Sequence, residues 1–176
     1  MKFYKSDWIV AIAVAVALLG GKIDLSGIFT PTPAPVVVVA IDEPTAAMKA
    51  VVQPVAALVT GTNATVDRAA LSEFYLAWGD MLQRDALSKK VTTTLALHDA
   101  NVSSGLLMFQ QTGIQGRYAT LAEQINKTLA AWVGLLDANG KVLNVPFDDA
   151  KRAKAVEYCK GLAWALNQSL LANPKG

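Results

Sequence analysis

Apolar residues are spread unevenly along this chain of 176 residues, and their longest run without a polar side chain lies near the N-terminus. It extends from Trp8 to Gly21, behind Lys2 and Lys5 and directly before Lys22. A short lysine-bearing start followed by such a run is typical of a signal sequence or of an inserted membrane anchor. As a helix, these fourteen residues would span roughly 21 Å, less than the roughly 30 Å of a bilayer's hydrocarbon core.

Residues 1–29 are therefore predicted to be an N-terminal membrane anchor or signal segment. The length favours a cleaved signal, but a small-x-small cleavage site is missing after the run, because Leu19 precedes Gly20 and Gly21. A buried helix is the third hypothesis. If the run is inserted, the lysines hold the N-terminus in the cytoplasm and the C-terminal domain lies in the periplasm or its equivalent. The residues expected to form the membrane anchor are Trp8, Ile9, Val10, Ile12, Val14, Val16, Leu18 and Leu19.

Residues 30–43 are predicted to be an extended linker rich in proline and valine. Prolines at every second position of Thr30–Pro35 fix φ and remove backbone donors, which favours a polyproline II spacer. The following run, Val36–Ile41, is β-branched and uncharged, as in a buried strand or an aggregation-prone segment. Because the chain has no second strand-like run, we expect this segment to pack on the helical domain or to extend a partner's sheet.

Residues 44–61 are predicted to form an alanine-rich helix. Asp42 and Glu43 lie before its start, where acids complement the helix dipole, and Pro44 suits the first turn. Pro54 is expected to kink or divide the helix. The predicted apolar face consists of Ala47, Val51, Val55 and Leu58.

Residues 62–176 show four helical patterns joined by short links, which predicts an antiparallel bundle of four to five helices. Thr65 is expected to cap the first helix, and Thr120 with Glu123 forms a capping box before the third. Asp148 and Asp149 begin the last. The apolar face predicted for the first helix consists of Leu71, Phe74, Trp78, Met81 and Leu82, and that of the second of Val91, Leu95, His98, Val102, Leu106 and Phe109. The face predicted for the third helix consists of Leu121, Ile125, Leu129, Trp132 and Leu136, and that of the fourth of Val156, Cys159, Leu162, Leu166 and Leu170. The predicted fold class is all-α, behind an N-terminal hydrophobic helix and a proline-rich linker.

Charge and cysteine usage exclude several classes of function. Sixteen basic and 14 acidic residues leave a net charge of +2 without a basic block, which argues against a dedicated nucleic-acid partner. Cys159 is the only cysteine and His98 the only histidine, so an intrachain disulfide and the usual zinc spacings are excluded.

Two residues are candidates for chemistry. His98 and Asp99 are the only histidine–carboxylate neighbours, but adjacent helical residues point about 100° apart, so we expect a core or boundary histidine. Cys159 would need a base to act as a nucleophile and lies on an apolar stripe, so we expect a small buried hydrophobe; the alternative is a thiol that cross-links two exported chains.

The remaining polar motifs favour surface roles. Glu73, Asp80 and Asp85 lack the Glu-x-x-His spacing of ferritin-like metal sites. The basic cluster Lys151, Arg152 and Lys154 is flanked by acids, so a mixed surface is expected rather than a site for anionic lipid. Four Asn-x-Ser/Thr sequences begin at residues 63, 101, 126 and 167; three fall within predicted helices, and we interpret all four as chance matches.

No catalytic, metal or cofactor motif stands out, so we expect a protein that is not an enzyme and that acts by binding. The leading hypothesis is a membrane-anchored structural or protein-interaction component of an envelope or virion complex. Its expected partners are the lipid bilayer and proteins not identified by the sequence, with a homo-oligomer also allowed. The alternatives are a phage lysis or membrane-perturbing factor, and an exported enzyme or ligand-binding protein with a cleaved signal and a pocket near His98.

Overall fold

Helices account for the regular structure of the described residues, 40–84 and 91–172, in this computed structural model. The prediction of an all-α fold is confirmed for this part of the chain. The predicted membrane anchor, with the linker as far as residue 39, lies outside it. Among the helices described here, none has both the length and the apolar character needed to cross a bilayer.

The helices are separated by short links, with one longer connection before the last helix. A loop joins α6 to α7, and isolated antiparallel bridges between Thr93 and Pro146 and between Leu136 and Val142 fix its path. The bounds are α2 Ala46–Ala56, α3 Ala64–Gln83, α4 Thr94–Thr112, α5 Ile114–Arg117, α6 Leu121–Val133 and α7 Asp149–Ala172.

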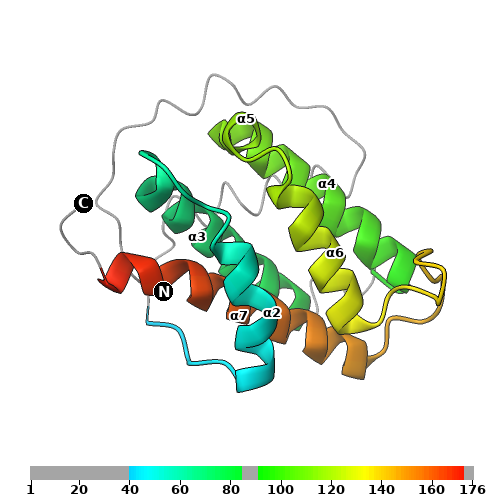
Figure 1. The fold of residues 1–176 in the computed structure, drawn as a ribbon. Helices are drawn as coiled ribbons and strands as arrows, with labels where there is room; N and C mark the ends of the chain where they lie inside the picture. The colour runs from blue at the N-terminus through cyan, green and yellow to red at the C-terminus, as the bar shows by residue number, and fades with distance from the viewer. Residues whose placement is uncertain (1–39, 85–90, 173–176) are drawn as a thin grey trace.

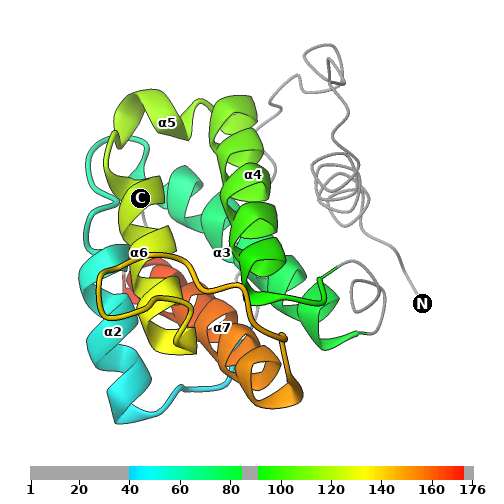
Figure 2. The same cartoon turned by 90° about the vertical axis from the view of Figure 1, so that its right-hand side faces the viewer.

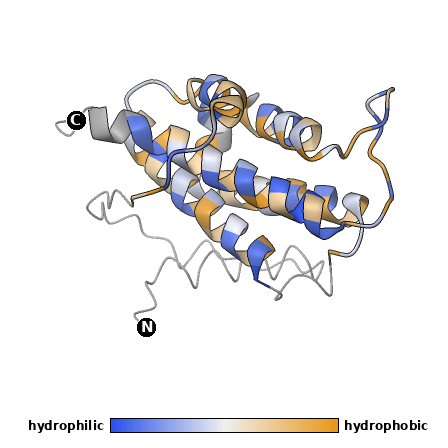
Figure 3. Ribbon diagram, turned by 90° about the horizontal axis from the view of Figure 1, so that it is seen from below, coloured by the Kyte–Doolittle hydropathy of each residue, from blue (hydrophilic) through white to orange (hydrophobic). Residues whose placement is uncertain are grey.

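The last helix, α7, organises the packing. It runs opposite to α3 along most of its length, and α2 packs across both α7 and α6 (Figure 1). The α4 helix packs on α6 and α5 on the other side of the molecule (Figure 2). Hydrophobic and hydrophilic residues alternate along the helices (Figure 3), as expected for helices that each bury one side.

One glycine in α7 and one in α3 allow neighbouring helices to approach each other closely. A Cβ atom at Gly161 of α7 would lie 2.5 Å from Cγ of Met48, so the Met48 side chain of α2 packs directly against the α7 backbone. A Cβ atom at Gly79 of α3 would lie 3.1 Å from Cβ of Cys159. These contacts fix how α2 and α3 are rotated on α7.

The predicted face of the alanine-rich helix is partly wrong. Val55 is buried, but Ala47 is exposed and the Leu58 side chain is 40% exposed. Gly161 accommodates Met48, and this rotates α2 away from the predicted orientation. The residues that α2 buries are Met48, Val52, Val55 and Ala56.

The start and end of α2 also differ from the prediction. The helix begins at Ala46, after Thr45, whose hydroxyl accepts a hydrogen bond from the Met48 amide at 3.2 Å. Pro54 does not divide the helix, because it lies in the last turn and α2 ends at Ala56.

The predicted apolar face of α4 is wrong along most of its length. Leu95 and Leu106 are 37% and 41% exposed, and His98 and Val102 are half-buried. Two polar residues at inner positions have partners there: the Thr94 hydroxyl lies 2.6 Å from the Leu143 carbonyl, and Asn101 donates to the Asn126 side chain of α6. The residues buried on α4 are Thr94, Leu97, Ala100, Asn101, Ser104, Gly105, Met108 and Phe109.

The other predicted faces are confirmed where the structure describes them. Their buried members are Leu71, Phe74, Trp78 and Leu82 of α3, Leu121, Ile125 and Leu129 of α6, and Cys159, Leu162 and Leu166 of α7. The predicted cap at Thr65 is wrong, because Asn63 precedes α3. Thr120 directly precedes α6 as predicted, but its side chain makes no cap bond, because its ψ of −6° is not the extended geometry of a cap.

Candidate functional site: an apolar groove between α2 and α6

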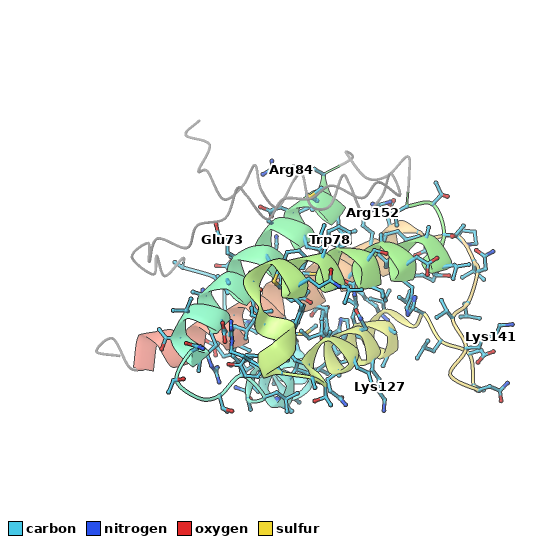
Figure 4. The ribbon with its side chains drawn as sticks, turned by 90° about the horizontal axis from the view of Figure 1, so that it is seen from above. Glu73, Trp78, Arg84, Lys127, Lys141 and Arg152 are labelled. Carbon is cyan, nitrogen blue, oxygen red and sulfur yellow. The ribbon has the colours of Figure 1, made fainter. Side chains whose placement is uncertain are left out.

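A groove of about 720 Å³ lies between α2 and α6. This volume falls in the range of roughly 300–1,000 Å³ that is typical of ligand pockets. None of its lining residues is charged, and Lys127 of α6 extends away from the helices (Figure 4). One wall consists of Ala50, Val51, Pro54, Val55 and Leu58, and the other of Thr120, Gln124, Thr128, Ala131 and Trp132.

The groove follows from how α2 packs. Because α2 buries Met48 and Val52 elsewhere, its Ala50 and Pro54 side is left open toward α6. Pro54 has no backbone N–H, so the Ala50 carbonyl lacks its usual helical donor. The α2 wall is made of apolar side chains.

A cluster of hydrogen bonds, here called the Asp67 clamp, joins the segment that follows α2 to the segment that precedes α6. It comprises the side chains of Asp67, Arg117 and Tyr118 and the carbonyl of Thr60. Arg117 Nε donates to Asp67 Oδ2 at 2.8 Å, and the Tyr118 hydroxyl lies 2.9 Å from both Asp67 Oδ2 and the Thr60 oxygen. Thr60 follows α2 and Tyr118 precedes α6, so the clamp holds these ends of the two walls together.

The clamp is ionic and lies partly in the interior. Asp67 is only 2% exposed, and its hydrogen bond raises the pKa of Arg117, so the guanidinium stays charged. Burial, and then the hydrogen bond to Asp67, raises the pKa of Tyr118, so the phenol stays protonated at neutral pH. No spacing signal in the sequence links Asp67 to Arg117.

Tyr158 of α7 fixes the position of the second wall. Its hydroxyl lies 2.5 Å from Thr128 Oγ1 and donates to the Ile125 carbonyl at 3.1 Å. Burial raises the pKa of Tyr158, which keeps this phenol protonated. Trp132, also on this wall, is half-buried, and its indole nitrogen has no hydrogen-bond partner among the described residues.

The candidate residues for chemistry lie outside the groove lining. His98 is half-buried, as expected for a boundary position, and its Nδ1 lies 3.5 Å from Asp99 Oδ1, closer than we expected but long for a hydrogen bond. Cys159 is fully buried, and burial raises the pKa of its thiol, so it lacks the thiolate character of a nucleophile. The prediction of a small buried hydrophobe at Cys159 is confirmed.

The described members of the charged clusters are exposed or half-buried. Within residues 40–84 and 91–172, no group of three or more His, Cys, Asp or Glu side chains is placed to hold a metal ion. Glu73 and Asp80 lie exposed on α3, and Asp85 lies outside the described residues. Lys151 pairs with Asp148 at 2.5 Å, which supports the mixed surface predicted for the basic cluster.

The asparagines of the four Asn-x-Ser/Thr sequences differ in accessibility. Asn63 is exposed before α3, whereas Asn101 and Asn167 are buried and Asn126 is bonded to Asn101. A glycan on either buried asparagine is incompatible with the fold, which supports the interpretation of at least these two as chance matches.

Comparison of the chain with protein-family models, with curated proteins and with solved structures gave no match. The functional proposal for this chain therefore rests on its own residues, foremost those of the α2–α6 groove.

Proposed function

We propose that this chain is a membrane-anchored, extracytoplasmic helical protein that acts by binding other proteins, as a structural or interaction component of an envelope or virion complex. The observation that carries this proposal is the α2–α6 groove. Its walls are uncharged, and they include Leu58 and Trp132, large apolar side chains that are only partly covered. Partly covered apolar surface of this kind marks interaction sites in soluble domains, and tryptophan is enriched at their energetic centres.

The shape of the groove supports a peptide segment as the occupant. Its α2 wall runs from Ala50 to Leu58, about 12 Å at the helical rise. That length accommodates roughly four residues of an extended chain or two turns of a helix. Both modes of peptide recognition use apolar grooves with few polar groups.

The groove is tested by placing a charge on its exposed wall. In Ala131→Arg the new guanidinium lies where an apolar segment would exclude water, and burying an unpaired charge is costly. We expect partner proteins that co-purify with the full-length chain from membranes to fall at least tenfold. The matched control is Ala153→Arg, at an exposed alanine of α7 outside the groove, which should retain them. Equal retention in both variants would contradict the proposal.

The anchor is tested separately. The uncharged run Trp8–Gly21 supports membrane attachment, so full-length chain should sediment with membranes and resist extraction by carbonate. Recovery of full-length chain in the soluble fraction would contradict this part. An intact mass that lacks the first twenty or so residues would instead establish a cleaved signal.

A second candidate function is an exported protein that binds a small apolar ligand. The volume of the groove favours it, since about 720 Å³ suits a drug-sized molecule as well as a few side chains. Native mass spectrometry distinguishes the two: a retained small molecule that Ala131→Arg releases supports the ligand-binding function.

A further inference from the structure

The α2–α6 groove and the linker before α2 match in chemistry. No charged residue lines the groove, and no charged residue lies between Asp24 and Asp42 in the sequence. Residues 30–35 alternate with proline, a pattern that favours polyproline II, and such segments bind grooves that contain aromatic side chains. Trp132 supplies an aromatic side chain in the groove wall.

The length of the linker also suits the groove. The described chain begins at Ala40, and the ten residues before it extend about 31 Å as polyproline II. This exceeds the roughly 12 Å of the α2 wall, so several registers place prolines along it. Thr32 and Ala34, which alternate with the prolines, each keep a backbone N–H, and the Ala50 carbonyl lacks its usual helical donor because of Pro54.

The path of residues 40–44 favours a linker from another molecule. In Figure 1 these residues reach the start of α2 from the left, whereas α6 lies to the right of α2. Ile41 packs against the core, and Pro44 lies beside Gly161 of α7. The same chain therefore enters α2 from the side opposite the groove. The linker of a neighbouring copy is not restricted in this way. Two copies anchored in one bilayer also have a high effective concentration for each other.

From these observations we propose that the α2–α6 groove binds residues 30–39 of a second copy of this chain. The inference rests on the proposed function and names the partner of the groove. Reciprocal exchange of the two linkers makes a symmetric dimer, and a one-way arrangement makes a chain of copies.

Cross-linking in the full-length protein tests the proposal. Unlabelled and ¹⁵N-labelled chains carrying benzoylphenylalanine at Leu58 are co-reconstituted in phosphatidylcholine vesicles and irradiated. Trypsin cleavage after Lys22 and Lys49 releases residues 23–49 as one peptide that contains the linker. We expect cross-links between Leu58 and this peptide in which the two partners carry different isotopes. The same group at Ala153 of α7 is the control and should not give them.

Two variants establish specificity. Replacing Pro31, Pro33 and Pro35 by serine, or introducing Ala131→Arg, should each reduce the mixed-isotope cross-link at least fivefold. Cross-links within single-isotope chains alone would overturn the proposal, because the linker would then bind its own groove. An unchanged yield in both variants would also overturn it.

The failure of this inference is distinguishable from failure of the proposed function. If Leu58 in cell membranes cross-links to other proteins and not to residues 23–49, a second copy is not the occupant but the groove is still a binding site. If Ala131→Arg changes neither the cross-links nor the co-purifying proteins, both proposals are wrong.

Discussion

Breaking the Asp67 clamp is expected to destabilise the chain and to loosen the end of the groove. In Arg117→Ala the carboxylate of Asp67, 2% exposed, loses its cation and keeps only the Tyr118 hydroxyl of the contacts given above. Removing one partner of a buried ion pair costs about 3–5 kcal/mol. Because the Arg117 side chain is 35% exposed, water reaches this pair from one side. We therefore expect a loss near the lower end, about 3 kcal/mol.

The opposite variant, Asp67→Asn, should cost less. Asparagine preserves the size of the side chain and one acceptor oxygen, while its amide group replaces an acceptor with a donor. The partly exposed guanidinium of Arg117 is then hydrated, so the expected loss is about 2 kcal/mol, in the range for hydrogen bonds to charged groups. In the double variant both changes remove the same interaction, so the two losses should overlap by about 1–2 kcal/mol.

Urea unfolding followed by far-UV circular dichroism measures these free energies. The full-length chain is used in a mild non-ionic detergent at pH 7, with linear extrapolation to water. Arg84→Ala is the control, because this guanidinium is 69% exposed and 3.9 Å from Asp80, and it should cost less than about 0.5 kcal/mol. The reasoning is refuted if Arg117→Ala costs no more than Arg84→Ala, or if the two clamp variants are additive.

Three further predictions concern the core. Gly161→Ala should lower the free energy of unfolding by about 1–3 kcal/mol, because the new Cβ would overlap buried side-chain atoms. Gly105→Ala should raise it by up to about 1 kcal/mol, because the nearest atom to a Cβ at Gly105 is 3.9 Å away. Urea unfolding of both variants checks this contrast. Tyr158→Phe should cost about 1 kcal/mol by removing the hydroxyl that holds α6 on α7, and thermal unfolding of the variant at pH 7 tests this. Burial raises the folded-state pKa of Cys159 and Tyr75. The free energy of unfolding should therefore be constant below a pH of about 8.5 and fall as the pH rises from 9 to 11. A midpoint of urea unfolding that stays constant over this range would contradict the prediction.

The sequence was sufficient to predict the all-α fold and the faces of the helices that bury regular apolar stripes. On α3, for example, Leu71, Phe74 and Trp78 repeat at helical spacing and are buried. Hydrophobic periodicity succeeds there because these helices pack on large apolar areas, which fixes their rotation.

Periodicity failed where polar pairing or close backbone contact determines the rotation. On α4 the inner positions include Thr94, whose hydroxyl lies 2.6 Å from the Leu143 carbonyl, and Asn101. A buried polar residue with partners is indistinguishable in one sequence from an exposed one. On α2 the contact of Met48 with Gly161 sets the rotation of the helix, and the apolar spacing does not reveal it.

The groove itself could not be predicted for a related reason. It depends on which flank of α2 is left open and on the Asp67 clamp, which joins residues 50 positions apart. Neither the pairing of Asp67 with Arg117 nor the nearness of α2 to α6 leaves a local pattern. Of the candidate residues, Cys159 is buried on its apolar stripe as predicted, and His98 is half-buried at the boundary position that we expected.

Hydrogen exchange in the membrane-bound protein tests most directly whether the groove is the binding surface. Amide exchange is compared between the full-length chain in its purified complex and the same chain after its partners are stripped. Binding should slow exchange in residues 50–58 and 124–132, the two walls of the groove, and leave the exposed N-terminal part of α7 near Ala153 unchanged. Protection confined to other surfaces, with both walls unaffected, would contradict the account.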